Sequence, residues 1–162
     1  MAVDYFLALD TIKGESIDAT YKGQIQVLSW SFGESNTVPP PTTGGGGAGK
    51  PNFSDFNLMK LVDAASPLLI RACALGTTLK TATLSGRRTA TGSAGKPFAF
   101  LLIQFTNVHV TSVQQSGSSE VPSESVSLQY SAIKYTETPT TATGAPGTPI
   151  TFTYDLATNK GS

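Results

Sequence analysis

The chain has 162 residues, which suits one domain, and charged residues make up only 14% of it. Eleven basic residues balance eleven acidic ones, so no basic excess is present to neutralise a nucleic-acid backbone. The single cysteine, Cys73, excludes an internal disulfide and a cysteine-based zinc site. The longest apolar run, residues 98–103, is far shorter than the roughly 20 residues of a membrane helix. Nucleic-acid binding, membrane insertion and a disulfide-stapled fold are therefore excluded.

The polar side chains are mostly hydroxylic, since the sequence contains 22 Thr and 17 Ser. Its first residues carry no positive charge and include Asp4, so the sequence predicts no secretory signal peptide. A zero net charge also removes one common barrier to association between copies.

Period-2 alternation of apolar residues predicts strands in the first third of the chain, at 4–10 and 25–32. In the second strand the apolar phase shifts from Ile25 and Val27 to Leu28, Trp30 and Phe32. Ser29 and Ser31 then share the opposite face. Trp30 and Phe32 are too apolar to remain exposed to solvent, so we expect them in the core and the two serines outside it.

Residues 37–52 are predicted to form a long loop that joins a polyproline stretch to a run of glycines. The segment Gly44–Lys50 matches the first seven positions of a phosphate-binding loop. Pro51 follows where that motif needs Ser or Thr, and no strand-then-helix context surrounds it. The segment is therefore interpreted as an exposed loop and not as a nucleotide site.

One helix is predicted, over residues 66–75, following a weaker strand at 53–61. Ser66 is expected as its N-cap, with Pro67 at the first helical position and Gly76 as the left-handed cap at its end. Cys73 lies inside this helix and is expected to be a small core residue.

The remainder of the chain again favours strands, at 79–91, 98–105, 107–114, 124–132 and 150–156. The near-continuous apolar run of 98–105 predicts a strand covered on both faces. The apolar phase of 124–132 shifts by one at Ile133, which predicts a bulge. A second long loop is expected at 138–149, and the tail 159–162 is expected to be frayed.

No catalytic constellation or cofactor or metal site emerges from these patterns. His109 is the only histidine and is expected at the surface or at a rim. Ser131 and Lys134 match S-x-x-K, but on a strand their side chains point to opposite faces. The residues alone therefore predict a mainly β single domain over 1–162 with a structural or binding role rather than an enzyme.

Several segments together resemble the haemolysin-coregulated protein (Hcp) family of the bacterial type VI secretion system. They occur in the family's order along essentially the whole chain, although loops 37–43 and 138–149 are richer in Pro and Thr and 79–97 matches weakly. The similar segments are 1–4, 13–18, 25–33, 44–50, 66–76 and 124–130.

This resemblance implies a β-barrel-like pair of packed antiparallel sheets with one short helix. It also implies a non-enzymatic subunit whose homohexameric rings stack into a tube that carries or chaperones effectors. The implied partners are further copies of the chain, the type VI spike, the sheath and effector proteins. The resemblance further implies synthesis in the cytoplasm and export through the type VI machine, without a signal peptide, to the extracellular space or a target cell.

Two groups of residues are assigned to this role. Ser29 and Ser31 are expected on the lumen surface, although bulk solvent beyond them would fit the alternation equally well. The candidates for ring-to-ring contact lie in the glycine-rich loop and are Pro40, Thr42, Gly44, Gly46, Gly49 and Lys50. Two other hypotheses stay open: a monomeric β-sandwich binding module with this loop as a ligand lid, and a small hydrolase around His109.

Overall fold

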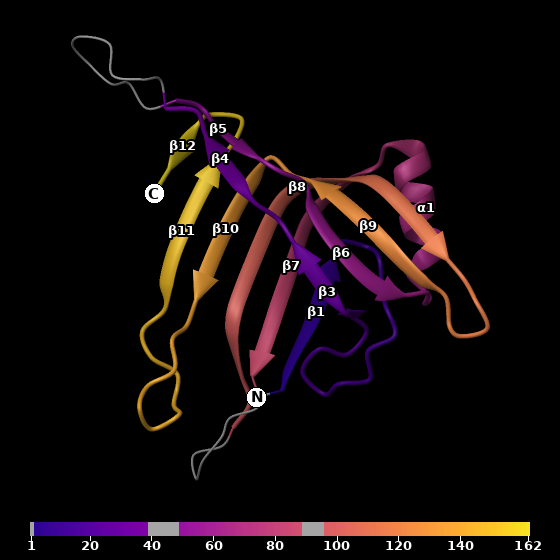
Figure 1. The fold of residues 1–162 in the computed structure, drawn as a ribbon, viewed down its shortest axis with the longest axis horizontal. Coiled ribbons are helices and arrows are strands. Elements are labelled where there is room, and N and C mark those ends of the chain that lie inside the picture. The colour runs from indigo at the N-terminus through magenta and orange to yellow at the C-terminus, as the bar shows by residue number, and fades with distance from the viewer. Residues whose placement is uncertain (1, 39–48, 89–95) are drawn as a thin grey trace.

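A computed structural model describes residues 2–38, 49–88 and 96–162. These residues form one short helix and a set of antiparallel strand pairs, shown in Figure 1. The elements are β1 (Val3–Leu9), β2 (Ile25–Val27), β3 (Ser29–Ser31), β4 (Glu34–Asn36), β5 (Pro51–Phe53), β6 (Phe56–Leu61), α1 (Ser66–Leu75), β7 (Thr78–Arg88), β8 (Phe98–Ser116), β9 (Ser123–Gln129), β10 (Ala132–Glu137), β11 (Ile150–Asp155) and β12 (Lys160–Gly161).

A barrel forms because the segment 25–31 changes its pairing partner. β2 pairs with β1, and β3 pairs with β6. Between them the amide of Leu28 donates to the carbonyl oxygen of Met59 at 2.8 Å. The pairing path β1–β7–β8–β9–β6 is thereby closed by β2 and β3. The predicted phase shift at Leu28 is confirmed as this change of partner, and Leu28 itself is exposed.

A flap of three strands extends from the barrel along β8 (Figure 1). The first half of β8 pairs with β10, and its second half pairs with β9. β11 continues the sheet beyond β10, and β12 closes its outer edge. We call β10, β11 and β12 the flap. The predicted strands 98–105 and 107–114 are thus one strand, because β8 serves both parts of the fold.

The phase change near Ile133 is confirmed, but the predicted bulge is wrong. Gln129 pairs with His109 and Ala132 pairs with Thr106, so the register is the same on both sides of the break. β8 bends at the same level, where Asn107 has a φ of 50°. The two strands turn together and keep their register. The real shift lies between Val110 and Ser112.

The core fills the barrel and consists of the inward residues of these alternating strands. Aromatic rings contribute strongly: Phe56 packs against Phe105 with centroids 4.9 Å apart, and Phe105 packs against Tyr130 at 4.7 Å. Trp30 and Phe32 are half-buried and pack against this cluster, as does Cys73. The second face of β8 is less covered than predicted, because Phe100 and Leu102 stay half-buried.

Helix α1 has the predicted span, but its N-cap lies one residue earlier than predicted. Ala65 occupies the cap position and Ser66 is already helical. The hydroxyl of Ser66 contacts Lys60, Asp63 and Glu124, as described below, so it does not cap the helix. Gly76 has a φ of 61°, which confirms the left-handed cap at the other end.

The tail and one loop also differ from the expectations. Lys160 pairs with Asp155, and the amide of Ser162 donates to the carbonyl oxygen of Thr153 at 2.9 Å. The prediction of a frayed tail is therefore wrong. A turn held by the Asp155 carboxylate returns the tail to the edge of β11. Residues 51 and 52 belong to β5, which pairs with β4, so the first loop ends earlier than predicted. Residues 138–149 form the predicted loop, which carries a bridge between Thr140 and Pro146.

Candidate functional site

A neutral polar surface covers the outer face of β3, β6 and β9. In antiparallel strands, residues directly opposite one another point to the same face. Ser31 pairs with Asn57, and Asn57 pairs with Ser127. In the same way Ser29, Met59 and Ser125 form a second row. We call these six residues the β3–β6–β9 face.

The alternation places the apolar partners of this face inside the barrel. Trp30, Leu58 and Val126 are paired across the same three strands; Leu58 and Val126 are buried in the core, and the half-buried Trp30 packs against it. Ser29 and Ser31 are exposed, as the sequence predicts. The hydroxyl of Ser127 donates to Oδ1 of Asn57 at 2.6 Å, so the face is partly fixed by its own hydrogen bonds.

A shallow groove of about 290 Å³ lies on this face. Its lining combines hydroxyl, amide and thioether groups, and none of the lining residues is ionisable. Such a surface offers hydrogen bonds and apolar contact without a strong charge preference. The arrangement suits weak binding of a large partner, and it lacks a nucleophile activated by a base.

The other candidate side chains lie elsewhere. His109 is on β8, where its Nε2 hydrogen-bonds Oγ1 of Thr78 at 2.8 Å. Cys73 is half-buried in α1. In the part of the chain that the structure describes, no three His, Cys, Asp or Glu side chains gather as they would around a metal ion.

Two of the predicted ring-to-ring residues, Gly49 and Lys50, lie in the described part of the glycine-rich loop. Lys50 is exposed, immediately before β5. A Cβ at Gly49 would lie 1.7 Å from the carbonyl oxygen of Thr37. Glycine therefore permits the backbone segments before and after the loop, the two arms of the loop, to approach this closely. The other four candidates, Pro40, Thr42, Gly44 and Gly46, lie outside the described residues.

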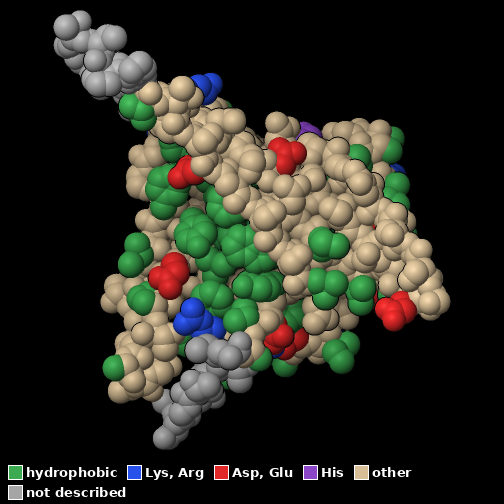
Figure 2. Space-filling model, viewed as in Figure 1, with side chains coloured by type: hydrophobic (Ala, Val, Ile, Leu, Met, Phe, Trp, Pro, Cys, Tyr) green, Lys and Arg blue, Asp and Glu red, His purple; other side chains and the backbone are tan. Residues whose placement is uncertain are grey.

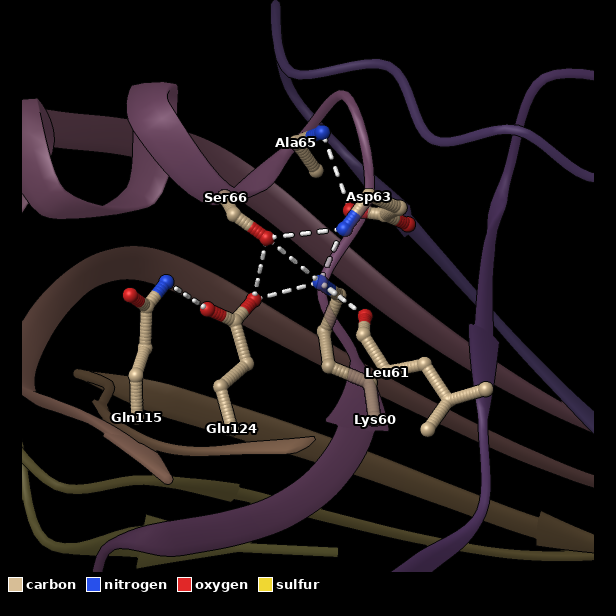
Figure 3. A network of polar contacts seen from close by, with 7 residues as sticks. All are labelled: Lys60, Leu61, Asp63, Ala65, Ser66, Gln115 and Glu124. Atoms are coloured by element: carbon tan, nitrogen blue, oxygen red, sulfur yellow. Dashed lines mark hydrogen bonds and ion pairs between the residues drawn. The ribbon is translucent and has the colours of Figure 1, made fainter. Parts of the chain in front are cut away.

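A buried ionic network supports the β3–β6–β9 face from inside (Figure 3). Lys60 of β6 and Glu124 of β9 are paired across the strands, and both side chains are fully buried. The Lys60 ammonium bonds the Glu124 carboxylate and donates to Oδ1 of Asp63 at 2.7 Å. Ser66 and Gln115 each donate to Glu124 at 2.8 Å. The network thus joins α1, the loop before it and three strands.

The network fixes the charge of Glu124. Burial alone would raise the pKa of this carboxyl. The hydrogen bonds from Gln115, Lys60 and Ser66, together with the Lys60 charge, outweigh burial and hold the pKa of Glu124 below its ordinary value. A buried carboxylate and ammonium stay ionised only because each is paired and hydrogen-bonded.

Sequence reasoning missed this network, although a signal exists. Lys60 follows Phe56 and Leu58 at the inward positions of β6, and Glu124 precedes Val126 and Leu128 at those of β9. Charges of opposite sign in the inward phase of two strands indicate a buried ion pair.

Comparison with known proteins decides the family. The family model described as "Type VI secretion system effector, Hcp" matches residues 6–136. The chain belongs to the Hcp family. Protein hcp1 of Pseudomonas aeruginosa is 34% identical over 98% of both chains.

Solved structures agree with the family assignment. A structure described as a type six secretion system protein matches 99% of this chain and 100% of its own, with a TM-score of 0.89 and 31% identity. Hcp1 from Salmonella typhimurium matches all of both chains, with a TM-score of 0.80 and 32% identity. These matches confirm the Hcp fold that the resemblance implies. Across the described residues, no helix combines the length and hydropathy of a membrane span.

Proposed function

We propose that this Hcp-family chain is a non-enzymatic tube subunit of the type VI secretion system. Six copies form a ring, and the rings stack into a tube that carries effector proteins in its lumen. Its partners are further copies, the spike, the sheath and the effectors. After synthesis in the cytoplasm, the type VI machine itself exports the chain without a signal peptide, to the extracellular space or a target cell.

The β3–β6–β9 face supports the lumen role most directly. Its residues project from paired strands, which a filled barrel and the Lys60–Glu124 pair hold from behind. A rigid surface without ionisable groups gives moderate contact to varied cargo, and it lets the cargo leave again. We assign Ser29 and Ser31 to cargo contact, because they are the exposed serines of β3.

Ring stacking is assigned to the glycine-rich loop. Gly49 allows the arms before and after the loop to converge, and Lys50 presents a charge where the loop joins β5. The sequence assigns Pro40, Thr42, Gly44 and Gly46 to the same contact. A surface loop between two paired strands, here β4 and β5, can contact a neighbouring subunit without disturbing the barrel.

The lumen assignment is tested by placing a bulky side chain on the face. Ser31→Trp should reduce the amount of effector that co-purifies with the chain from its source cells by about tenfold or more. The number of subunits in the ring should stay the same. Ser118→Trp is the matched control, because Ser118 is an exposed serine in the turn after β8 and outside the face. Effector recovery is measured by quantitative mass spectrometry. Unchanged recovery with Ser31→Trp would refute the lumen assignment.

A further inference from the structure

An apolar hollow lies where the flap meets the barrel, and Figure 2 shows hydrophobic side chains gathered there. Phe152 of the flap is 41% exposed, beside the half-buried Tyr135 and Phe53. The hollow has a volume of about 330 Å³. It is lined by Phe32, Gly33, Glu34, Phe53, Ile133, Tyr135 and Phe152.

Packing between aromatic side chains makes the hollow rigid. The Phe53 and Tyr154 rings lie 5.1 Å apart, and the Phe32 and Tyr135 rings lie 6.4 Å apart. Glu34 supplies the only ionisable carboxylate of the lining. A small-molecule site usually encloses most of its ligand and fixes it with a few placed polar groups, whereas this hollow is open to solvent on one side. This hollow instead has the character of a receptor for apolar side chains and one cation.

Helix α1 lies at the other end of the molecule (Figure 1), and it carries an exposed stripe of side chains that we call the ridge. Leu68, Arg71 and Leu75 are spaced i, i+3 and i+7, so they share one helical stripe. Leu68 is 40% exposed and Leu75 is 68% exposed. Arg71 lies between them and is the only charged residue of the helix. Amphipathic helices dock into apolar grooves with this spacing of anchors.

Charge is complementary between the two surfaces. Among the described residues, neither Glu34 nor Arg71 has an oppositely charged group within 4.0 Å. The ridge and the hollow are different surfaces of one chain. A contact between them is therefore heterologous, and repeated contacts of this kind close into a ring when the rotation per copy permits.

We infer that the Leu68–Arg71–Leu75 ridge of one copy docks into the apolar hollow of the next copy. The leucines contact the aromatic lining, and Arg71 meets Glu34. This inference rests on the proposed ring and names its side-to-side interface. It leaves the β3–β6–β9 face free, because none of that face's residues belongs to either surface.

Two substitutions that each introduce a negative charge test the inference. Leu75→Glu damages only the ridge, and Phe152→Glu damages only the hollow. Each variant alone should be a monomer by native mass spectrometry. Mixed in equal amounts, they should form a one-to-one dimer, because the intact ridge of the Phe152→Glu chain docks in the intact hollow of the Leu75→Glu chain. Ile17→Glu is the control and should retain the ring, since Ile17 is 95% exposed outside both surfaces.

Circular dichroism checks that each variant is folded, and Leu75→Ser with Phe152→Ser repeats the test without added charge. A Leu75→Glu chain that still forms full rings would overturn the inference and leave the proposed tube function standing. Failure of the mixed variants to dimerise would also overturn it. A monomeric unsubstituted chain would instead refute the proposed function itself.

Discussion

Two residues far apart in sequence, Lys60 and Glu124, hold the interior of the molecule at the back of the β3–β6–β9 face. Their side chains have no exposed area, and each has further hydrogen-bond partners. Removal of one member of such a pair typically costs about 3–5 kcal/mol, because the other charge is left buried and uncompensated. The pair therefore couples the ionisation of one carboxyl to the stability of the whole barrel.

Stability should fall in acid because of Glu124. Its folded pKa lies below the ordinary value of 4.5, so the folded state favours the ionised carboxylate more than the unfolded state does. This contribution is fully present above pH 4.5 and is lost as the pH falls through the folded pKa. Urea unfolding between pH 7 and pH 3 should show a declining free energy of unfolding in that window.

Glu124→Gln is the matched variant, because it keeps the shape and removes the titrating carboxyl. It should be less stable at pH 7 by about 1.5–3 kcal/mol, the usual contribution of hydrogen bonds to a charged group, because Lys60 loses one carboxylate partner and keeps Asp63. The difference from the unsubstituted chain should narrow below pH 4.5. An equal acid loss in both chains would assign the pH dependence to other groups. Protein concentration is held constant, because association also contributes to apparent stability.

At the scale of elements, α1 is short and depends on its two ends and its packing. The Asp63 carboxylate accepts from the amide of Ala65 at 3.0 Å at the first end, and Gly76 ends the helix with a φ of 61°. A ten-residue helix is marginal in water, so these ends and the buried Leu69 and Ala72 hold it in place.

Gly76→Ala should destabilise the chain by roughly 1–2 kcal/mol, because an L-residue is strained in the left-handed conformation. This corresponds to a fall in melting temperature of about 2–4 °C for each kcal/mol in a chain of this size. Gly117→Ala is the control: its φ is not positive, and its new Cβ would make only ordinary contacts with the Pro122 ring, at 3.7 and 3.8 Å. Equal melting temperatures for both variants would contradict the role of Gly76.

Alternation along the chain predicts most of the elements, and pairing over long distances explains what it misses. The spacing of apolar residues predicts the strands, and Pro67 and Gly76 at its two ends predict α1, because each signal is a local property of its segment. The closure at Leu28, the single strand β8 and the Lys60–Glu124 pair depend on partners many residues away. β12 was missed because its strand pairing comes from a turn and the free edge of β11, while its own composition is polar.

The same distinction applies to the candidate site. Alternation predicts that Ser29 and Ser31 share an exposed face, and the structure confirms this exposure. Alternation alone cannot predict that Asn57, Met59, Ser125 and Ser127 belong to the same face, because their position beside β3 follows from the order of the strands in the sheet. The lumen role of the face stays a proposal that follows from the family.

At the scale of the whole molecule, low charge and exposed apolar surface favour association. The chain has a net charge of zero, so copies meet without long-range repulsion. The hollow and the α1 ridge leave large apolar side chains in water in a single copy. Contiguous apolar surface of this kind marks an interaction site in a folded protein. The neutral β3–β6–β9 face is separate from both, which leaves it accessible for the proposed contact with cargo.

The mass of the native assembly tests the ring most directly. Native mass spectrometry of the unsubstituted chain at micromolar concentration should show a main species with the mass of six chains. Because the proposed interface buries apolar groups, this species should persist when salt is raised from about 0.1 M to 1 M, which shortens the Debye length from about 10 Å to 3 Å. A monomer as the only species under both conditions would contradict the account.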